Sequence, residues 1–324
     1  IANPSYMVKG WSFGIRPEVL QKNVNKAKKQ GAEIVVLLSH NGFDVDQKLA
    51  SMIDGIDVIL TGHTHDAIPK GIRIRDTLLL SSGSHGKYLG RIDLTVKNGK
   101  VVDTSSNLIP VFSDVIPPDP DMKNLINKIR APYQKVCNRV IGKTETLLYR
   151  RGNFNGSWDN VLCDTIMQER DTEISLSPGF RWGTTLLPGQ EITIDDIYSQ
   201  TSMNYPEVYR IEMTGKMIKE ILEDVCDNIF NPDPFFQQGG DMVRVGGLTY
   251  TCHPKNKMGN RISDLRIISS DKPLESNKNY IVGGWGSVNQ NVKGPPVYNL
   301  LENYISEKKI IKKSNLEAVK IVGM

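Results

Sequence analysis

The sequence predicts a mixed α/β fold in two parts, on the strength of three observations. Two short apolar runs, at 33–38 and 56–60, each follow a segment whose apolar residues have helical spacing. Both runs are continuously apolar, which is typical of strands that are covered on both faces in an α/β sheet. A proline-rich stretch at 110–120 leads to a second α/β region, and 324 residues are enough for two domains.

The first part is expected to run helix, strand, helix, strand and then a hairpin. The first helix covers 17–30 and ends at Gly31, because glycine favours the turn that follows a helix. A short helix is expected at 44–54, between the two strands. Alternating segments then follow at 77–82, 88–96 and 100–104. Asn98-Gly99 lies between the last two segments and predicts a hairpin turn, so this part should end near residue 110.

The second part follows a linker and helix at 111–138 and covers 139–324. Within it, helices are expected after Ser157 and after Thr214, because both hydroxyl residues are good N-caps for the apolar helical patterns behind them. The chain has four cysteines and no Cys-x-x-Cys pair, which argues against a zinc site. Disulfides and buried free thiols both remain open for Cys137, Cys163, Cys226 and Cys252.

Composition and charge exclude several classes of protein. Hydrophobic residues make up 39% of the chain and charged residues 23%, which is ordinary for a globular protein. The net charge of +4 is spread along the chain, so no nucleic-acid partner is expected, although an anionic substrate would suit it. No run of 18 apolar residues occurs, so no membrane span is expected. Because the chain begins with Ile1, we expect a mature product or a fragment, with any signal peptide upstream.

Three of the five histidines follow the ends of the two predicted strands. His40 comes directly after the first run, and His63 and His65 follow the second in the sequence Gly-His-Thr-His. Imidazole is the commonest protein ligand for metals, and loops at strand ends often present such ligands. We therefore predict a divalent metal site at His40, His63 and His65, which needs further oxygen ligands to become a two-metal centre. Ordinary loop histidines are the alternative, and we favour it for His85 and His253.

These motifs resemble the calcineurin-like metallophosphoesterase domain, which the 5′-nucleotidase family joins to a C-terminal substrate domain. The resemblance is most specific to the SoxB family of thiosulfohydrolases, at 38–50, 151–159, 177–183 and 239–247. It covers essentially the whole chain. It implies the C-terminal half of a four-layer metallophosphoesterase domain at 1–110, followed after the linker by an α/β 5′-nucleotidase-type domain at 139–324.

The resemblance also implies a chemistry. It implies a hydrolase with two divalent ions, Mn²⁺ by analogy, that releases sulfate from a cysteine S-thiosulfonate on the C-terminal arm of the SoxYZ carrier protein in the periplasm. The family's Asp-x-His, Gly-Asp and Gly-Asn ligand motifs do not precede His40 here. We therefore expect an N-terminally truncated fragment that holds about half of the metal site, does not bind both ions tightly and could lack turnover.

Four residues of the second part are candidates for binding an anionic substrate. Arg181 and Trp182 lie in a glycine-flanked turn, and an arginine fork suits the oxygens of a sulfonate or phosphate. With the family resemblance, this predicts a catalytic role for both. Arg244 is a second candidate for contacting the anion, and Asp241 could orient one of the arginines. A solvated surface charge is the alternative for a single loop arginine.

Two aromatic residues bear on the class of substrate. Trp285 has small neighbours that could leave its ring exposed in a cleft, with a core tryptophan as the alternative, and Tyr205 is a weaker candidate. In nucleotidases such rings sandwich the base, whereas in a SoxB-like protein they would line a narrow entry for a peptide arm. A 5′-nucleotidase or 2′,3′-cyclic nucleotide phosphodiesterase is therefore the alternative function. A non-catalytic module that binds the carrier is a third, and fewer than two tightly bound ions per chain would favour it.

Overall fold

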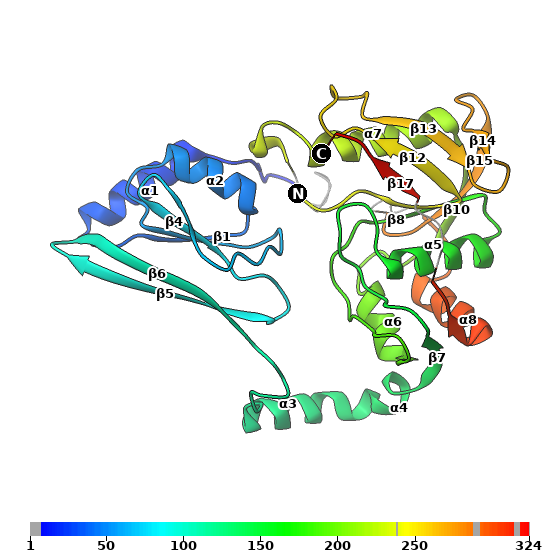
Figure 1. Cartoon of the computed structure of the whole chain (residues 1–324), viewed down its shortest axis with the longest axis horizontal. Coiled ribbons are helices and arrows are strands. Elements are labelled where there is room, and N and C mark those ends of the chain that lie inside the picture. The colour runs from blue at the N-terminus through cyan, green and yellow to red at the C-terminus, as the bar shows by residue number, and fades with distance from the viewer. Residues whose placement is uncertain (1–7, 238, 288–291, 314–317, 324) are drawn as a thin grey trace. The chain divides into compact units, whose positions relative to one another are not determined.

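The computed structural model of the chain describes residues 8–237, 239–287, 292–313 and 318–323 (Figure 1). The chain forms two compact units. The first contains Lys9–Ile126 and Pro232–Gly239, and the second contains Asn127–Asn231 and Gly240–Met324. The short segment 232–239 therefore folds with the first unit, although its sequence neighbours belong to the second. Our domain limits at 110 and 138 stay predictions.

The first unit is built on a four-stranded sheet in the order β1-β2-β4-β3. Three strands run parallel, and β3 pairs with β4 in the antiparallel sense. The strands are β1 (Val36–Ser39), β2 (Val58–Thr61), β3 (Ile72–Ile74) and β4 (Thr77–Ser81). The parallel order confirms the mixed α/β class. It also brings the carboxyl ends of β1, β2 and β4 to one edge of the sheet, where the histidine loops begin.

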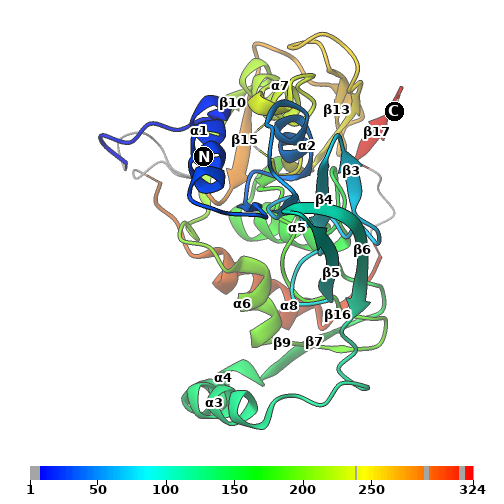
Figure 2. The same cartoon turned by 90° about the vertical axis from the view of Figure 1, so that its left-hand side faces the viewer.

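Two helices pack on one face of this sheet, as Figures 1 and 2 show. They are α1 (Pro17–Lys29) and α2 (Phe43–Met52). Gly31 has a φ of 95°, the left-handed conformation that glycine adopts after a helix, so the predicted end of α1 is confirmed. The core between the helices and the sheet consists of Val24, Val45, Leu49, Ala50, Ile53, Ile56, Ile59 and Leu79.

Strand β1 corrects the prediction that both early strands are covered on both faces. Strands β2 and β4 are largely buried, but Val36 is 48% exposed and Leu38 is 77% exposed on β1. Among the described residues β1 pairs only with β2 and so forms the edge of the sheet. A run of apolar letters cannot tell an edge strand from a central one, because that depends on partners distant in sequence.

A long two-stranded ribbon follows the sheet, formed by β5 (Tyr88–Lys97) and β6 (Lys100–Pro110) (Figure 2). Asn98 and Gly99 have φ values of 51° and 70°, the positive pair that a two-residue hairpin of this type requires, so the predicted turn is confirmed. The Gly71 N–H donates to Ser106 Oγ at 2.8 Å and ties the ribbon to the loop before β3. Helix α3 (Pro120–Arg130), the short η1 (Ala131–Tyr133) and α4 (Gln134–Cys137) then lead out of the ribbon.

The described residues of the second unit form three sheets. The sheet that carries most of the site has the order β10-β15-β8-β11, with β8 and β15 parallel and the outer strands antiparallel to their neighbours. Its strands are β8 (Ile174–Ser177), β10 (Tyr209–Thr214), β11 (Arg244–Gly246) and β15 (Asn279–Gly284). The second sheet holds β12 (Leu248–Cys252), β13 (Ile262–Ile267), β14 (Lys272–Pro273) and β17 (Val319–Ile321). The third holds β7 (Val140–Thr144), β9 (Glu191–Thr193) and β16 (Ile310–Ile311).

Four helices pack around these sheets: α5 (Ser157–Arg170), α6 (Ile194–Thr201), α7 (Gly215–Ile229) and α8 (Val297–Lys308). Thr214 caps α7, since its hydroxyl accepts from the Met217 N–H at 3.2 Å, as predicted. Ser157 does not cap α5. Gly156 holds the N-cap position, and the Ser157 hydroxyl instead donates to the Leu147 carbonyl at 2.6 Å. No helix in the part of the chain that the structure describes is long and apolar enough to cross a membrane.

Candidate functional site

The histidine loops leave the sheet of the first unit at the carboxyl ends of β1 and β2. The rings of His40 and His63 lie edge to face, with centroids 5.1 Å apart. The ring of His65 instead lies 5.8 Å from that of His85. The three predicted ligands therefore fall into two pairs, and the second pair includes a histidine for which we had favoured an ordinary loop position.

The residues that the structure describes contain no group of three or more His, Cys, Asp or Glu side chains placed to hold a metal ion. His40 and His63 offer two imidazoles, which is fewer than the three or four protein ligands of a typical zinc site. Carboxylates are near these loops, since Asp66 adds to burial in raising the pKa of Asp44. The described side chains thus fit only part of a metal site, and they do not gather the three predicted histidines into one group.

The histidine loops are held in an unusual backbone conformation. His63, His65 and His85 have φ values of 77°, 61° and 60°, in the left-handed region that side chains other than glycine seldom adopt. Each such residue costs on the order of 1–3 kcal/mol, and such residues cluster at functional sites, where the surrounding structure maintains them. Described residues outside these loops, such as Arg75 and Lys309, adopt the same conformation, so the backbone is compatible with a functional role without identifying one.

Asp46 connects the starts of the two histidine loops through hydrogen bonds. Its carboxylate is fully buried and accepts from Ser39 Oγ at 2.7 Å, from Asn41 Nδ2 at 3.3 Å and from the Thr61 hydroxyl. A buried carboxylate needs such donors to offset its lost hydration. Asp46 therefore joins the end of β1 to the end of β2. Sequence reasoning missed this role, although an aspartate beside the buried Val45 was a signal that could have revealed it.

A distant segment of the chain also lies on the histidine loops. A Cβ added to Gly239 would lie 2.3 Å from His63 Nε2, so only a glycine backbone can approach the ring this closely. The rest of the segment is held by Lys48 of α2, whose Nζ lies 2.6 Å from Asp233 Oδ1 and 4.1 Å from the centre of the Phe235 ring. Gly239 thus contributes to the first unit.

A cavity of about 430 Å³ also lies in the first unit, lined by Leu38, Ser39, His40, Leu60, Thr61, Gly62, Leu80, Ser82, Gly83 and Gly90.

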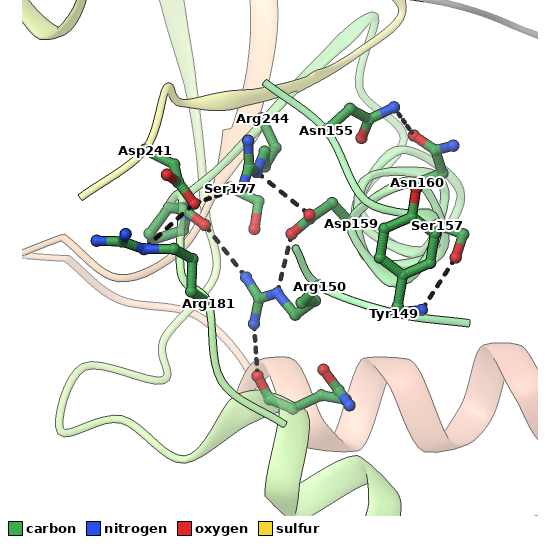
Figure 3. A network of polar contacts seen from close by, with 12 residues as sticks. Tyr149, Arg150, Asn155, Ser157, Asp159, Asn160, Ser177, Arg181, Asp241 and Arg244 are labelled. Atoms are coloured by element: carbon green, nitrogen blue, oxygen red, sulfur yellow. Dashed lines mark hydrogen bonds and ion pairs between the residues drawn. The ribbon is translucent and has the colours of Figure 1, made fainter. Parts of the chain in front are cut away.

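The second unit holds a row of alternating charges, which Figure 3 shows from close by. We call it the arginine ladder, and its members in order are Arg150, Asp159, Arg244, Asp241 and Arg181. The successive nitrogen–oxygen distances are 2.9, 3.2, 3.1 and 3.6 Å. The first four side chains are buried, whereas that of Arg181 is 16% exposed. Arg181 is therefore the member of the ladder that reaches toward solvent.

Backbone carbonyls anchor the buried end of the arginine ladder. Arg150 donates to the Gln200 carbonyl at 2.7 Å and to the Pro178 carbonyl at 3.1 Å. Arg244 donates to the Gly152 carbonyl at 2.8 Å. Fixed acceptors hold guanidinium groups in one orientation, since the fork of donors is planar and rigid. The hydrogen bond from Arg150 to the Pro178 carbonyl therefore joins the buried end of the ladder to the turn that carries Arg181.

The arginine ladder is cationic. It contains three guanidinium groups and two carboxylates, so its charge is +1 when all five are ionised. Burial raises the pKa of Asp241, and Arg244 and Arg181 act to lower it. Burial likewise raises the pKa of Asp159 against the opposing effect of Arg150 and Arg244. Protonation of either carboxylate would make the row more positive, so it favours an anion at its exposed end in every case.

The structure corrects two of the predicted substrate contacts. Arg244 lies inside the arginine ladder with its side chain buried, so it is not placed to contact a substrate anion. Asp241 lies against both Arg181 and Arg244. Trp285 is only 3% exposed, and its Nε1 donates to Ser177 Oγ at 2.8 Å. The expected exposed ring is wrong, because Trp285 packs within a hydrophobic core cluster and its ring lies 5.9 Å from that of Phe180.

The remaining candidates are half-buried. Trp182 stacks on Phe180 with ring centroids 3.8 Å apart and an angle of 18° between the planes. The Tyr205 carbonyl accepts from the Gly286 N–H at 3.1 Å. Sequence reasoning did not single out Phe180, Arg150 or Asp159. Phe180 and Asp159 lie in the stretches that carry the family resemblance, which was the only signal that pointed to them.

Comparisons with known proteins agree with the resemblance predicted from the sequence. Residues 140–288 match the family described as 5′-nucleotidase, C-terminal domain. Among solved structures the chain is similar to SoxB, a sulfate thiohydrolase of Thermus thermophilus, with a TM-score of 0.94 and 35% identity over 100% of this chain and 61% of SoxB. A 5′-nucleotidase precursor from the same species has a TM-score of 0.82 at 19% identity, over 97% of this chain and 68% of that one, and shares the fold.

Curated relatives are more distant. The trifunctional nucleotide phosphoesterase YfkN of Bacillus subtilis is 26% identical over 76% of this chain and 17% of its own length. A snake venom 5′-nucleotidase of Gloydius brevicauda is 22% identical over 81% of this chain and 50% of its own length. The chain therefore spans half or less of these two relatives.

Proposed function

We propose, from the membership of residues 140–288 in the 5′-nucleotidase C-terminal domain family, that the chain is part of a hydrolase of the SoxB type. The observation that carries the proposal is the similarity to SoxB along the whole chain at 35% identity. The position of Arg181 at the exposed end of a cationic row supports an anionic substrate independently.

The proposed reaction releases sulfate from a cysteine S-thiosulfonate. Water or hydroxide supplies an oxygen to the terminal sulfonate sulfur, and the bond from that sulfur to the sulfane sulfur breaks. The electron pair of the broken bond stays on the sulfane sulfur, which remains on the carrier as a persulfide, while sulfate leaves. Arg181 would hold the sulfonate oxygens and offset the charge that grows on them as the new bond forms.

The arginine ladder would keep Arg181 in place during this reaction. Asp241 pairs with both Arg181 and Arg244 and is buried, so it resists rotation of the Arg181 guanidinium toward solvent. Trp182, next in sequence, would shield one side of the sulfonate through its stacked position on Phe180. Excluding water from a charged site strengthens each electrostatic contact within it.

The metal part of the proposal rests on the resemblance. Two divalent ions, Mn²⁺ by analogy, would supply the activated hydroxide when bound. His40, His63 and His65 are the proposed ligands in this chain, and the described side chains do not complete a centre for either ion. We therefore assign no step to a metal. The SoxYZ carrier arm as partner and the periplasm as location are likewise proposed from the resemblance.

Hydrolysis of a nucleotide is the alternative, favoured by the activities for which the curated relatives are named. It needs aromatic rings that are free to stack on a base, and Trp285, the best candidate from the sequence, is buried. The decisive assay uses the purified full-length protein with thiosulfonated carrier and with AMP. Faster release of sulfate is expected, and faster release of phosphate from AMP would overturn the SoxB-type proposal.

Arg181→Ala tests the role of the arginine. Loss of one charged donor at a developing anion typically lowers kcat about 10²–10³-fold, and a comparable loss of sulfate release is expected. Arg266→Ala, which removes an exposed arginine of β13 paired with Asp271, is the matched control and should leave the rate unchanged. Equal rates for Arg181→Ala and the parent would remove Arg181 from the mechanism.

A further inference from the structure

Two of the four cysteines meet inside the second unit. Cys226 lies in the last turn of α7, and Cys252 is the last residue of β12. Their sulfur atoms are 3.5 Å apart, and both side chains are fully buried. Cys163 and Cys137 lie on other elements and show no such contact among the described residues. We propose that Cys226 and Cys252 form a disulfide bond when the chain folds in an oxidising environment.

Polar contacts fix the two elements that carry these cysteines. Glu223, one turn before Cys226, accepts from the backbone N–H groups of Arg261 and Ile262 at 2.9 and 3.0 Å. Ile262 begins β13 and pairs directly with Cys252 in the antiparallel ladder. The helix and the strand are therefore held side by side at this point, whether or not the sulfur atoms are bonded.

A second contact holds the same end of α7. The Arg261 guanidinium lies 2.7 Å from Asp227 Oδ1 and donates to the Phe230 carbonyl at 3.0 Å. A disulfide needs its sulfur atoms about 2.05 Å apart. The two sulfur atoms must therefore approach by about 1.5 Å for the bond to form.

The bond would form by exchange with an external disulfide, such as oxidised glutathione. One thiolate of the pair attacks a sulfur of that disulfide, forms a mixed disulfide and displaces the first thiolate product. The other protein thiolate then attacks the cysteine sulfur of the mixed disulfide, which forms the protein disulfide and displaces the second external thiolate. The two protons of the cysteine thiols pass through water to the two displaced thiolates, so the cysteines are oxidised and the external disulfide is reduced to two thiols.

Burial decides when this exchange can occur. Neither sulfur is accessible in the folded unit, so the external disulfide must react before α7 closes against β12, or during a transient opening. The Cys226 thiol, by donating to the Cys252 sulfur, lowers the pKa of Cys252, which makes it the better attacking group. After closure the same burial shields the bond from reductants. The bond would therefore persist as part of the structure.

Refolding the 324-residue chain in a mixture of reduced and oxidised glutathione tests the proposal. The product is denatured, alkylated without reduction, digested and analysed by mass spectrometry. A linked peptide pair containing Cys226 and Cys252 is expected, with Cys137 and Cys163 alkylated. Alkylation of both Cys226 and Cys252, or a linkage between other cysteines, would overturn the proposal.

Thermal unfolding gives a second measurement. The bond would close a loop of about 26 residues, so the oxidised chain should melt on the order of 10 °C above the reduced chain. Both forms are prepared by refolding, one in oxidising and one in reducing buffer, because reductant does not reach the bond in the folded unit. The double variant Cys226→Ser with Cys252→Ser should melt at the same temperature in both forms. The variant Cys137→Ser is the matched control and should show the same difference as the parent. A difference between the two forms that survives in the double variant would contradict the assignment.

Discussion

Replacing Asp159 by asparagine tests the arginine ladder most directly. The carboxylate lies between two buried guanidinium groups, 2.9 Å from Arg150 Nε and 3.2 Å from Arg244 Nε. At an effective dielectric constant of about 20, two unit charges about 4 Å apart attract by roughly 4 kcal/mol. Asp159→Asn preserves the shape of the side chain but leaves both arginines without a charged partner between them.

The expected cost is smaller than the sum of the two attractions, because the carboxylate also regains its lost hydration in the unfolded chain. Removing one partner of a buried ion pair typically costs about 3–5 kcal/mol. For a unit of this size, each 1 kcal/mol lowers the melting temperature by about 2–4 °C. Asp159→Asn should therefore melt on the order of 10 °C below the parent.

Tryptophan fluorescence can follow this transition, because three of the four tryptophans belong to the second unit: Trp158, Trp182 and Trp285. Asp164→Asn is the matched control, since Asp164 lies on the same helix and is exposed. The control should change the melting temperature by only a few degrees. A cost below about 1 kcal/mol for Asp159→Asn would mean that Asp159 is neutral in the folded protein, and the alternation of charges would be refuted.

Four other predictions address separate features. Thr193→Ala removes the capping box of α6, in which Thr193 Oγ1 accepts from the Asp196 N–H, and should cost about 1 kcal/mol in urea unfolding; no change would show that the cap is not stabilising. Gly239→Ala should displace the segment 232–239 from His63, seen as a changed ring resonance of His63 in NMR spectra; an unaltered resonance would contradict the close approach. Burial raises the pKa of Cys163 to about 12, so the folded state favours the neutral thiol. The free energy of unfolding should therefore be constant below about pH 9 and should fall by on the order of 2–3 kcal/mol by about pH 11, where the unfolded chain loses this proton more readily. Urea unfolding at both pH values measures this loss, and Cys163→Ala should lose less over the same range. After dialysis against Mn²⁺-free buffer, elemental analysis should find fewer than two Mn²⁺ ions per chain, whereas two retained ions would show that these residues suffice.

Much of the fold follows from local features of the sequence. The turn at Asn98 and Gly99, the end of α1 at Gly31 and the cap at Thr214 each depend on residues within a few positions, so the sequence predicts them correctly. The cap predicted at Ser157 failed for a physical reason that is not local. The Ser157 hydroxyl donates to the Leu147 carbonyl and accepts from the Tyr149 N–H, and Gly156 holds the N-cap position of the helix instead.

In the candidate site, too, local features could be predicted from the sequence and contacts between distant segments could not. The residue types and their positions at strand ends pointed to His40, His63 and His65, and the turn at 177–183 pointed to Arg181. In the folded chain, however, His65 pairs with His85 and Gly239 lies on His63. These contacts join residues that no local pattern relates, because they depend on how distant segments pack.

Burial was the property that the sequence predicted least well. An arginine such as Arg244 carries the same letter whether it binds a substrate or neutralises Asp159 in the core, and only the packing of α5 against β11 decides between them. The order of the elements, several of their caps and turns, and a resemblance specific enough to name a family can all be read from the amino acids alone. Which charges are buried together, and which one reaches solvent, becomes visible only in three dimensions, because the free energy of a charge depends on every group that surrounds it in space.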